Sequence, residues 1–314
     1  MEHLILGAGA SLAQAIDCDV PMDMRPPVMG NFARTMSDNY SPEPLLSLFI
    51  RTLQHQPDRD ARDSFYELES TGVTDVEAFL QFAWENRELG SKLAAELYGH
   101  KGISYWENLL YHGLGSPLAN RILVGFCEGG EYRDLSLSRA VLARYRNDDL
   151  IVNLNYDTLA EIALKQSNQE FAYLPNRIAD DVLKVCKPHG SLNMSFRDDY
   201  FAFGQPEWLG VPQQHGHRSF SGLIPPRADK SFAMNRLSSL IVDPVRDRRP
   251  ERVTFWGVGF AKSDVDILAL YRSWLSPTVR IDVVNPVSDV ARVASEMFGM
   301  PVRWLPDIRD WLAL

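Results

Sequence analysis

The sequence predicts an α/β protein built on a Rossmann-like parallel sheet with helices on both faces. Three segments carry this prediction: "HLILGAGASLAQAI" from residue 3, "DLIVNLNYDTLAEIALKQ" from residue 149 and "RVTFWGVGFAKSDVDILALYRSWL" from residue 252. Each has a short apolar run, then a turn with small or polar residues, then an amphipathic helix. Apolar strands that alternate with such helices are typical of a parallel sheet covered on both sides.

Residues 31–148 have a different pattern, with helical spacing of apolar residues and few strand-like runs. A length of 314 residues allows either one elaborated α/β domain or an α/β domain with an insertion. The helical spacing favours the second interpretation. We therefore predict a Rossmann-like domain formed by residues 1–30 and 149–314, and a mostly α-helical insertion at 31–148.

Charge and cysteine content exclude several classes of protein. A net charge of −9 disfavours sequence-specific nucleic-acid binding, and the one dense basic cluster, "RDRRPER" at 246–252, is typical of a solvated loop. Three scattered cysteines form no disulfide framework and no zinc ribbon. The same cysteine pattern leads us to expect no bound metal. We also expect a cytoplasmic protein, because neither a signal peptide nor an apolar run of membrane-spanning length is visible.

The first candidate site is the glycine turn "GAGAS". Gly7, Ala8, Gly9 and Ser11 lie between a predicted strand and a predicted helix, where backbone N–H groups can approach a pyrophosphate. The turn departs from the dehydrogenase fingerprint, because Leu12 stands at the third glycine position and no acidic second strand follows. A purely structural turn is therefore a serious alternative.

Two further candidates follow predicted strands. In "LNYDT", Asn155 and Asp157 can exchange hydrogen bonds with a ligand at the strand ends, although capping of the next helix explains them equally well. In "KPHGSLN", His189 is poorly placed to fill a core and suited to proton transfer near neutral pH. Most loop histidines are merely solvated, but here Lys187 and other polar residues surround it.

Late turns complete the candidate set. Gly257 and Gly259 follow one predicted strand and suit close approach to a ribose or phosphate, and Asn285 ends the last predicted strand. Each is a common turn by itself. Several such loops at one sheet edge favour a ligand site there. His215 and His217 have no companion ligands at metal spacing, so we assign them to a loop.

Taken in order, "GAGAS", "NLNYDT", "KPHGSLN", "LIPP", "GVGFAKSDVDI" and "VVNP" resemble the bacterial sirtuin-like domains of the silent-information-regulator superfamily, especially those of anti-phage defence proteins. The resemblance implies binding of NAD as a substrate and cleavage of its nicotinamide–ribose bond. It assigns the pyrophosphate and its ribose to the glycine turn, and the adenosine half to Gly257, Gly259 and Asn285. Asn155 and Asp157 would orient the nicotinamide ribose or a water, and His189 would act as general base.

Protein-deacylating sirtuins carry a four-cysteine zinc module, which three isolated cysteines cannot build. The helical insertion at 31–148 follows the glycine turn directly, and in this the chain resembles NAD-depleting defence effectors. The resemblance implies regulation by a partner protein or by homo-oligomer formation, because uncontrolled NAD loss would harm the host. Two alternatives stay open. One is a module that senses NAD or ADP-ribose without turnover, and the other is ADP-ribosyl or acyl transfer to a protein.

Overall fold

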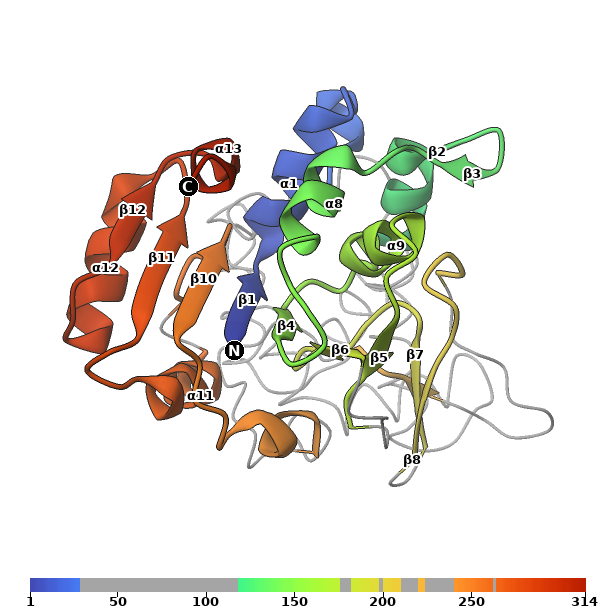
Figure 1. The fold of residues 1–314 in the computed structure, drawn as a ribbon. Coiled ribbons are helices and arrows are strands. Elements are labelled where there is room, and N and C mark those ends of the chain that lie inside the picture. Colours follow the sequence, from blue (N-terminus) through green and yellow to red (C-terminus); the bar gives the residue numbers. More distant parts are fainter. Residues whose placement is uncertain (29–117, 176–181, 198–199, 210–219, 224–239, 262–263) are drawn as a thin grey trace, which may run out of the picture.

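The computed structural model describes residues 1–28, 118–175, 182–197, 200–209, 220–223, 240–261 and 264–314 (Figure 1). Its centre is a seven-stranded sheet in the order β12-β11-β10-β1-β4-β6-β5, and every neighbouring pair is parallel. The strands are β1 (Glu2–Leu6), β4 (Leu150–Asn153), β5 (Phe171–Tyr173), β6 (Leu183–Cys186), β10 (Arg252–Trp256), β11 (Arg280–Val284) and β12 (Arg303–Leu305). The predicted Rossmann-like α/β fold is confirmed.

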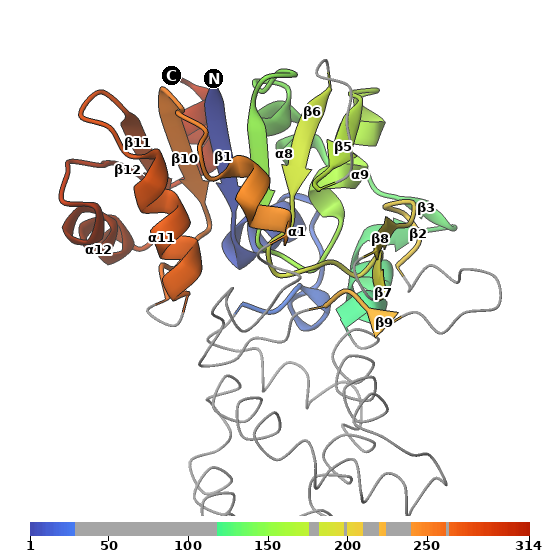
Figure 2. The same ribbon diagram turned by 90° about the horizontal axis from the view of Figure 1, so that it is seen from below.

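Helices cover both faces of this sheet (Figure 2). One face packs against α1 (Ala8–Asp17), α8 (Ser136–Leu142), α9 (Leu159–Gln166) and α13 (Ile308–Leu312). The other packs against α11 (Val265–Trp274) and α12 (Ser288–Phe298). The central strands are buried on both faces because successive side chains enter opposite cores: on β1, Leu4 and Leu6 enter the first and Ile5 the second.

Two smaller sheets are separate from the main sheet. An antiparallel three-stranded sheet combines β7 (Met194–Arg197), β8 (Tyr200–Phe203) and β9 (Phe220–Ser221), and β2 (Cys127–Glu128) pairs with β3 (Glu131–Tyr132) as a hairpin. Short 3-10 helices span Met22–Met24 and Asp243–Val245. Within the described ranges, no helix is long and apolar enough to cross a membrane.

Residues 29–117, which make up most of the predicted insertion, lie outside the described residues, as do His215 and His217. The last part of the predicted insertion is described. There α8 packs between α1 and α9 on one face of the Rossmann-like sheet, and Leu137, Val141 and Leu142 are buried in the core on that face. The limits of the insertion stay a prediction.

Candidate functional site

A cavity of about 740 Å³ lies at the carboxyl edge of the parallel sheet. Loops that follow six neighbouring strands line it, in the order β12, β11, β10, β1, β4 and β6. All ten residues proposed from the sequence are on its wall: Gly7, Ala8, Gly9, Ser11, Asn155, Asp157, His189, Gly257, Gly259 and Asn285. In open α/β sheets, ligands bind at this edge.

The glycine turn is pressed against the turn that follows β10. The Gly9 N–H donates to the carbonyl of Gly257 at 3.0 Å. A Cβ on Gly7 would lie 2.4 Å from the same carbonyl oxygen, and Gly257 has φ +67°. Because these contacts exclude any side chain, packing alone accounts for Gly7, Gly9 and Gly257. The Gly9 N–H is also occupied, so an anion here has to use other donors at the start of α1.

Ser11, Asn155 and Asp157 form one hydrogen-bonded group on the cavity wall. Asn155 Nδ2 donates to the Gly7 carbonyl at 2.9 Å and to Ser11 Oγ at 2.8 Å, and Ser11 Oγ donates to Asp157 Oδ2 at 2.7 Å. A carbonyl can only accept, so the amide orientation of Asn155 is determined by Gly7. Asn155 Oδ1 accepts no hydrogen bond within the described part of the chain, and it remains available to a ligand in the cavity.

Asp157 has a second contact that the sequence also suggested. Its Oδ1 accepts from the backbone N–H of Leu159 at 3.1 Å, at the first residue of α9. The carboxylate is buried, with 5% of the residue exposed. Asp157, which precedes the N-cap residue Thr158, therefore accepts from the first N–H of α9 and ties α9 to α1 through Ser11. With both oxygens engaged, it is better placed to orient its neighbours than to react.

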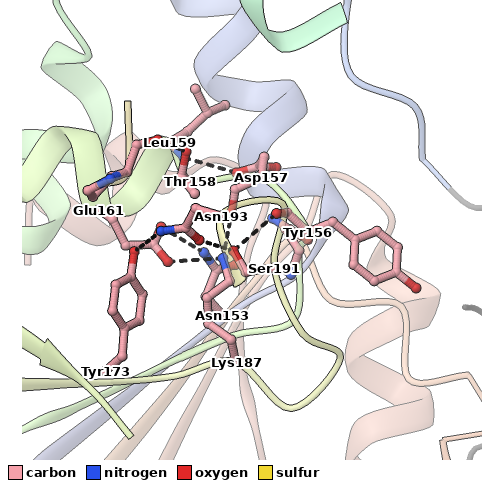
Figure 3. A network of polar contacts seen from close by, with 12 residues as sticks. Asn153, Tyr156, Asp157, Thr158, Leu159, Glu161, Tyr173, Lys187, Ser191 and Asn193 are labelled. Carbon is pink, nitrogen blue, oxygen red and sulfur yellow. Dashed lines mark hydrogen bonds and ion pairs between the residues drawn. The ribbon is translucent and has the colours of Figure 1, made fainter. Parts of the chain in front are cut away.

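A buried ion pair lies next to this group (Figure 3). Lys187 Nζ donates to Glu161 Oε1 at 2.9 Å, and both side chains are 0% exposed. Burial raises the pKa of the Glu161 carboxyl, and the nearby Lys187 charge opposes that shift. Lys187 is predicted from the sequence only as a polar neighbour of His189, and Glu161 is not predicted. The available signal was a glutamate amid the apolar positions of "LAEIALK".

The loop after β6 is anchored by polar side chains and by a tight backbone contact. Ser191 Oγ donates to Asn193 Oδ1 at 2.6 Å, and Asn193 Nδ2 donates to Tyr173 Oη at 3.0 Å (Figure 3). Gly190 has φ +79°, and a Cβ there would lie 1.7 Å from the carbonyl oxygen of Gly222. These contacts hold the backbone on the C-terminal side of His189.

His189 lies close to an acid that the sequence analysis did not single out. Its Nε2 is 3.9 Å from Asp264 Oδ1, and the two side chains are 14% and 16% exposed. Asp264 precedes α11 and also lines the cavity. A carboxylate in this position places negative charge beside an imidazole that would become positive on taking up a proton. Only the fold brings these two residues together, since Asp264 in "GFAKSDVDI" follows His189 in "KPHGSLN" by 75 positions.

The far end of the cavity has weaker polar contacts. Asn285 Nδ2 donates to the Val258 carbonyl at 3.3 Å, and its Oδ1 accepts from the Val287 N–H at 3.0 Å, near the start of α12. Arg309, also unpredicted, lines the wall and donates to Asp17 Oδ1 at 2.6 Å. No signal in the sequence marked Arg309 as part of the site.

No group of three or more metal-ligating side chains lies together among the residues that the structure describes. Comparison with protein-family models finds none that matches the chain, and comparison with curated proteins finds no match.

Proposed function

We propose that this protein is an NAD glycohydrolase that cleaves the nicotinamide–ribose bond to give nicotinamide and ADP-ribose. The observation that carries the proposal is the convergence of all ten sequence-derived residues on one cavity. They come from five separate strand-end loops, and they include both a hydrogen-bonded Ser11–Asn155–Asp157 group and a histidine. A structural role for each loop alone does not require that they share one wall.

The dimensions of the cavity support a dinucleotide ligand. Its volume of about 740 Å³ falls within the range of pockets that bind small molecules and cofactors. Neighbouring strands are about 4.8 Å apart, so the six strand ends that line it span roughly 24 Å. This is room for an extended ligand with one end near His189 and the other near Asn285, and the N-terminus of α1 between them offers positive dipole charge to a pyrophosphate.

The chemistry assigned to this site uses few groups. When the bond between ribose C1′ and the nicotinamide nitrogen breaks, its electron pair leaves with nicotinamide, and the sugar becomes oxocarbenium-like. Water adds its oxygen to C1′ and loses a proton to His189. Asn155 Oδ1, held toward the cavity, accepts from a ribose hydroxyl or from that water. Pre-oriented polar groups stabilise such a transition state more effectively than a strong nucleophile would.

The proposal extends to regulation. An enzyme that depletes cytoplasmic NAD would damage its own host, so we place it as an effector of anti-phage defence that is activated by a partner protein or by assembly of several copies. The support is the sequence resemblance to such effectors together with the reaction itself.

The test is incubation of the purified protein with NAD, alone and together with the products of neighbouring genes, with nicotinamide followed by chromatography. We expect release by the wild type and by Asn147→Ala, whose exposed side chain is away from the cavity. Asn155→Ala and His189→Ala should abolish it. NAD binding without release would identify a sensor, and label transferred to protein would identify a transferase; either result would overturn the hydrolase.

A further inference from the structure

We infer that Glu161, Lys187 and Asn153 form a buried clamp that positions the 155–157 turn and links it to the His189 loop. The inference rests on the proposed function for its catalytic consequence. None of the three residues lines the main cavity. They act through the backbone of residues that do, so they are positioning residues.

Lys187 joins the two loops. Its ammonium donates to Glu161 Oε1 at 2.9 Å and to the backbone carbonyl of Asp157 at 2.6 Å (Figure 3). Lys187 is also two residues before His189 in the chain. One side chain therefore sets the distance between the loop that carries the proposed base and the turn that carries Asn155.

Asn153 connects Glu161 to the other end of the turn by two hydrogen bonds. Its Nδ2 donates to Glu161 Oε2 at 3.2 Å, and its Oδ1 accepts from the Asn155 N–H at 3.0 Å. A carboxylate only accepts, so Glu161 determines which way the Asn153 amide faces. Asn153 thus holds the backbone N–H of Asn155, and Lys187 holds the backbone carbonyl of Asp157. Both side chains donate hydrogen bonds to the Glu161 carboxylate.

Stability alone does not explain a pair of charges in this place. Removing two charges from water is expensive, and well-packed apolar residues often replace a buried ion pair without loss of stability. Here both oxygens of Glu161 have donors, and the charges contact the backbone of the turn. A geometric role for the clamp explains why polar residues occupy a fully buried position.

Glu161→Gln tests the clamp with little change of shape. A glutamine offers one acceptor and one donor, so if its oxygen stays on Lys187, its nitrogen faces Asn153 Nδ2 and two donors meet. Asn153 can avoid this only by turning its amide, which then presents Nδ2 to the Asn155 N–H. In either arrangement, one hydrogen bond of the clamp is lost and the turn is released.

The double variant Asn153→Asp with Glu161→Gln should repair the clamp. The carboxylate at position 153 accepts both from the glutamine nitrogen and from the Asn155 N–H, and the buried negative charge is kept. Glu207→Gln is the matched control, because it removes a carboxylate that pairs with Lys165 of α9 at a half-exposed position.

We would measure kcat and KM for nicotinamide release well below the melting temperature, together with hydrogen–deuterium exchange of a peptide that contains Asn155. Glu161→Gln should lower kcat by about 10-fold or more, with a smaller change in KM, and should speed exchange at the turn. The double variant should return both values to within about 3-fold of wild type, and Glu207→Gln should change neither.

A purely structural role would lower the melting temperature of Glu161→Gln and leave kcat and exchange at wild-type values, and this result would overturn the clamp. A folded double variant that fails to recover would overturn it as well. If the wild type releases no nicotinamide, the proposed function fails. The clamp is still tested by hydrogen–deuterium exchange of Glu161→Gln, because accelerated exchange at the turn supports it and unchanged exchange overturns it.

Discussion

The two halves of the cavity are built in different ways. Over β1, β4 and β6, buried side chains bond to one another, as in the Ser11–Asn155–Asp157 group and the clamp beside it. Over β10, β11 and β12, the wall is made mostly by backbone packing at Gly257, by an asparagine turn and by the pair of Arg309 with Asp17. From this half, Asp264 reaches toward the other half, where it lies beside His189.

This difference separates two tasks. Groups that stabilise developing charge have to be held in place before the reaction, and a buried hydrogen-bonded network does this. Groups that only accommodate the rest of a ligand need the right shape. We therefore expect bond breaking over β4 and β6, and binding of the other end of the ligand over β10 to β12. Substitutions in the two halves should accordingly affect different measurements.

The largest effect is expected for Asn155→Asp. The change replaces the Nδ2 that faces the Gly7 carbonyl with a second acceptor, so the side chain has to turn away and Oδ1 loses its orientation. The rate of nicotinamide release should fall by about 100-fold or more. Asn285→Asp is the matched change in the other half; it loses only a 3.3 Å contact and should cost less than about 10-fold. Equal losses would contradict a division of tasks.

Gly257→Ala should chiefly affect stability. A Cβ at Gly257 would lie 2.2 Å from the backbone nitrogen of Ala10, at a position with φ +67°. The free energy of unfolding, measured with urea, should fall by about 2 kcal/mol or more. A Cβ at Gly259 would have no atom within 4 Å, so Gly259→Ala should change the free energy of unfolding by less than about 0.5 kcal/mol. A tolerated Gly257→Ala would mean that the two turns are not held this closely.

Ser11→Ala should have an intermediate effect. It removes the hydroxyl that donates to Asp157 and accepts from Asn155, and it leaves buried polar atoms short of a partner. We expect a loss of about 1–2 kcal/mol in unfolding free energy together with a lower kcat. Ser136→Ala, which removes an exposed hydroxyl that donates to Asp17, is the control. A similar loss in both variants would argue against a special role for the buried group.

The smallest effect is expected for Arg309→Ala. Arg309 is 58% exposed and its partner Asp17 is 17% exposed, so the pair should contribute less than about 1 kcal/mol to stability. Because Asp17 already balances the charge of Arg309, loss of the Arg309 side chain should change KM for NAD by only a few-fold and leave kcat unchanged. A large fall in kcat would mean that the reacting centre extends to β12, and it would contradict the division of tasks between the two halves.

Local patterns predicted much of the fold. The strands β1, β4, β6, β10 and β11 were all predicted from short, mostly apolar runs in the sequence. The edge strands β5 and β12 did not, because each has three residues, and on β12 two of these are exposed. The order β10-β1-β4 was also not predictable, since β1 pairs with residues about 150 and 250 positions away, and no local pattern encodes such pairing.

The candidate site divides in the same way. By itself, the sequence determined which loops carry small or polar residues after a strand, and so it predicted ten residues that share a cavity wall. Only the tertiary structure decided their partners: Gly9 against Gly257, Ser11 between Asn155 and Asp157, and Lys187 with Glu161. The physical reason is range. Strand and turn preferences act over a few residues, whereas hydrogen bonds between loops depend on strand order, which the packing of the whole sheet determines.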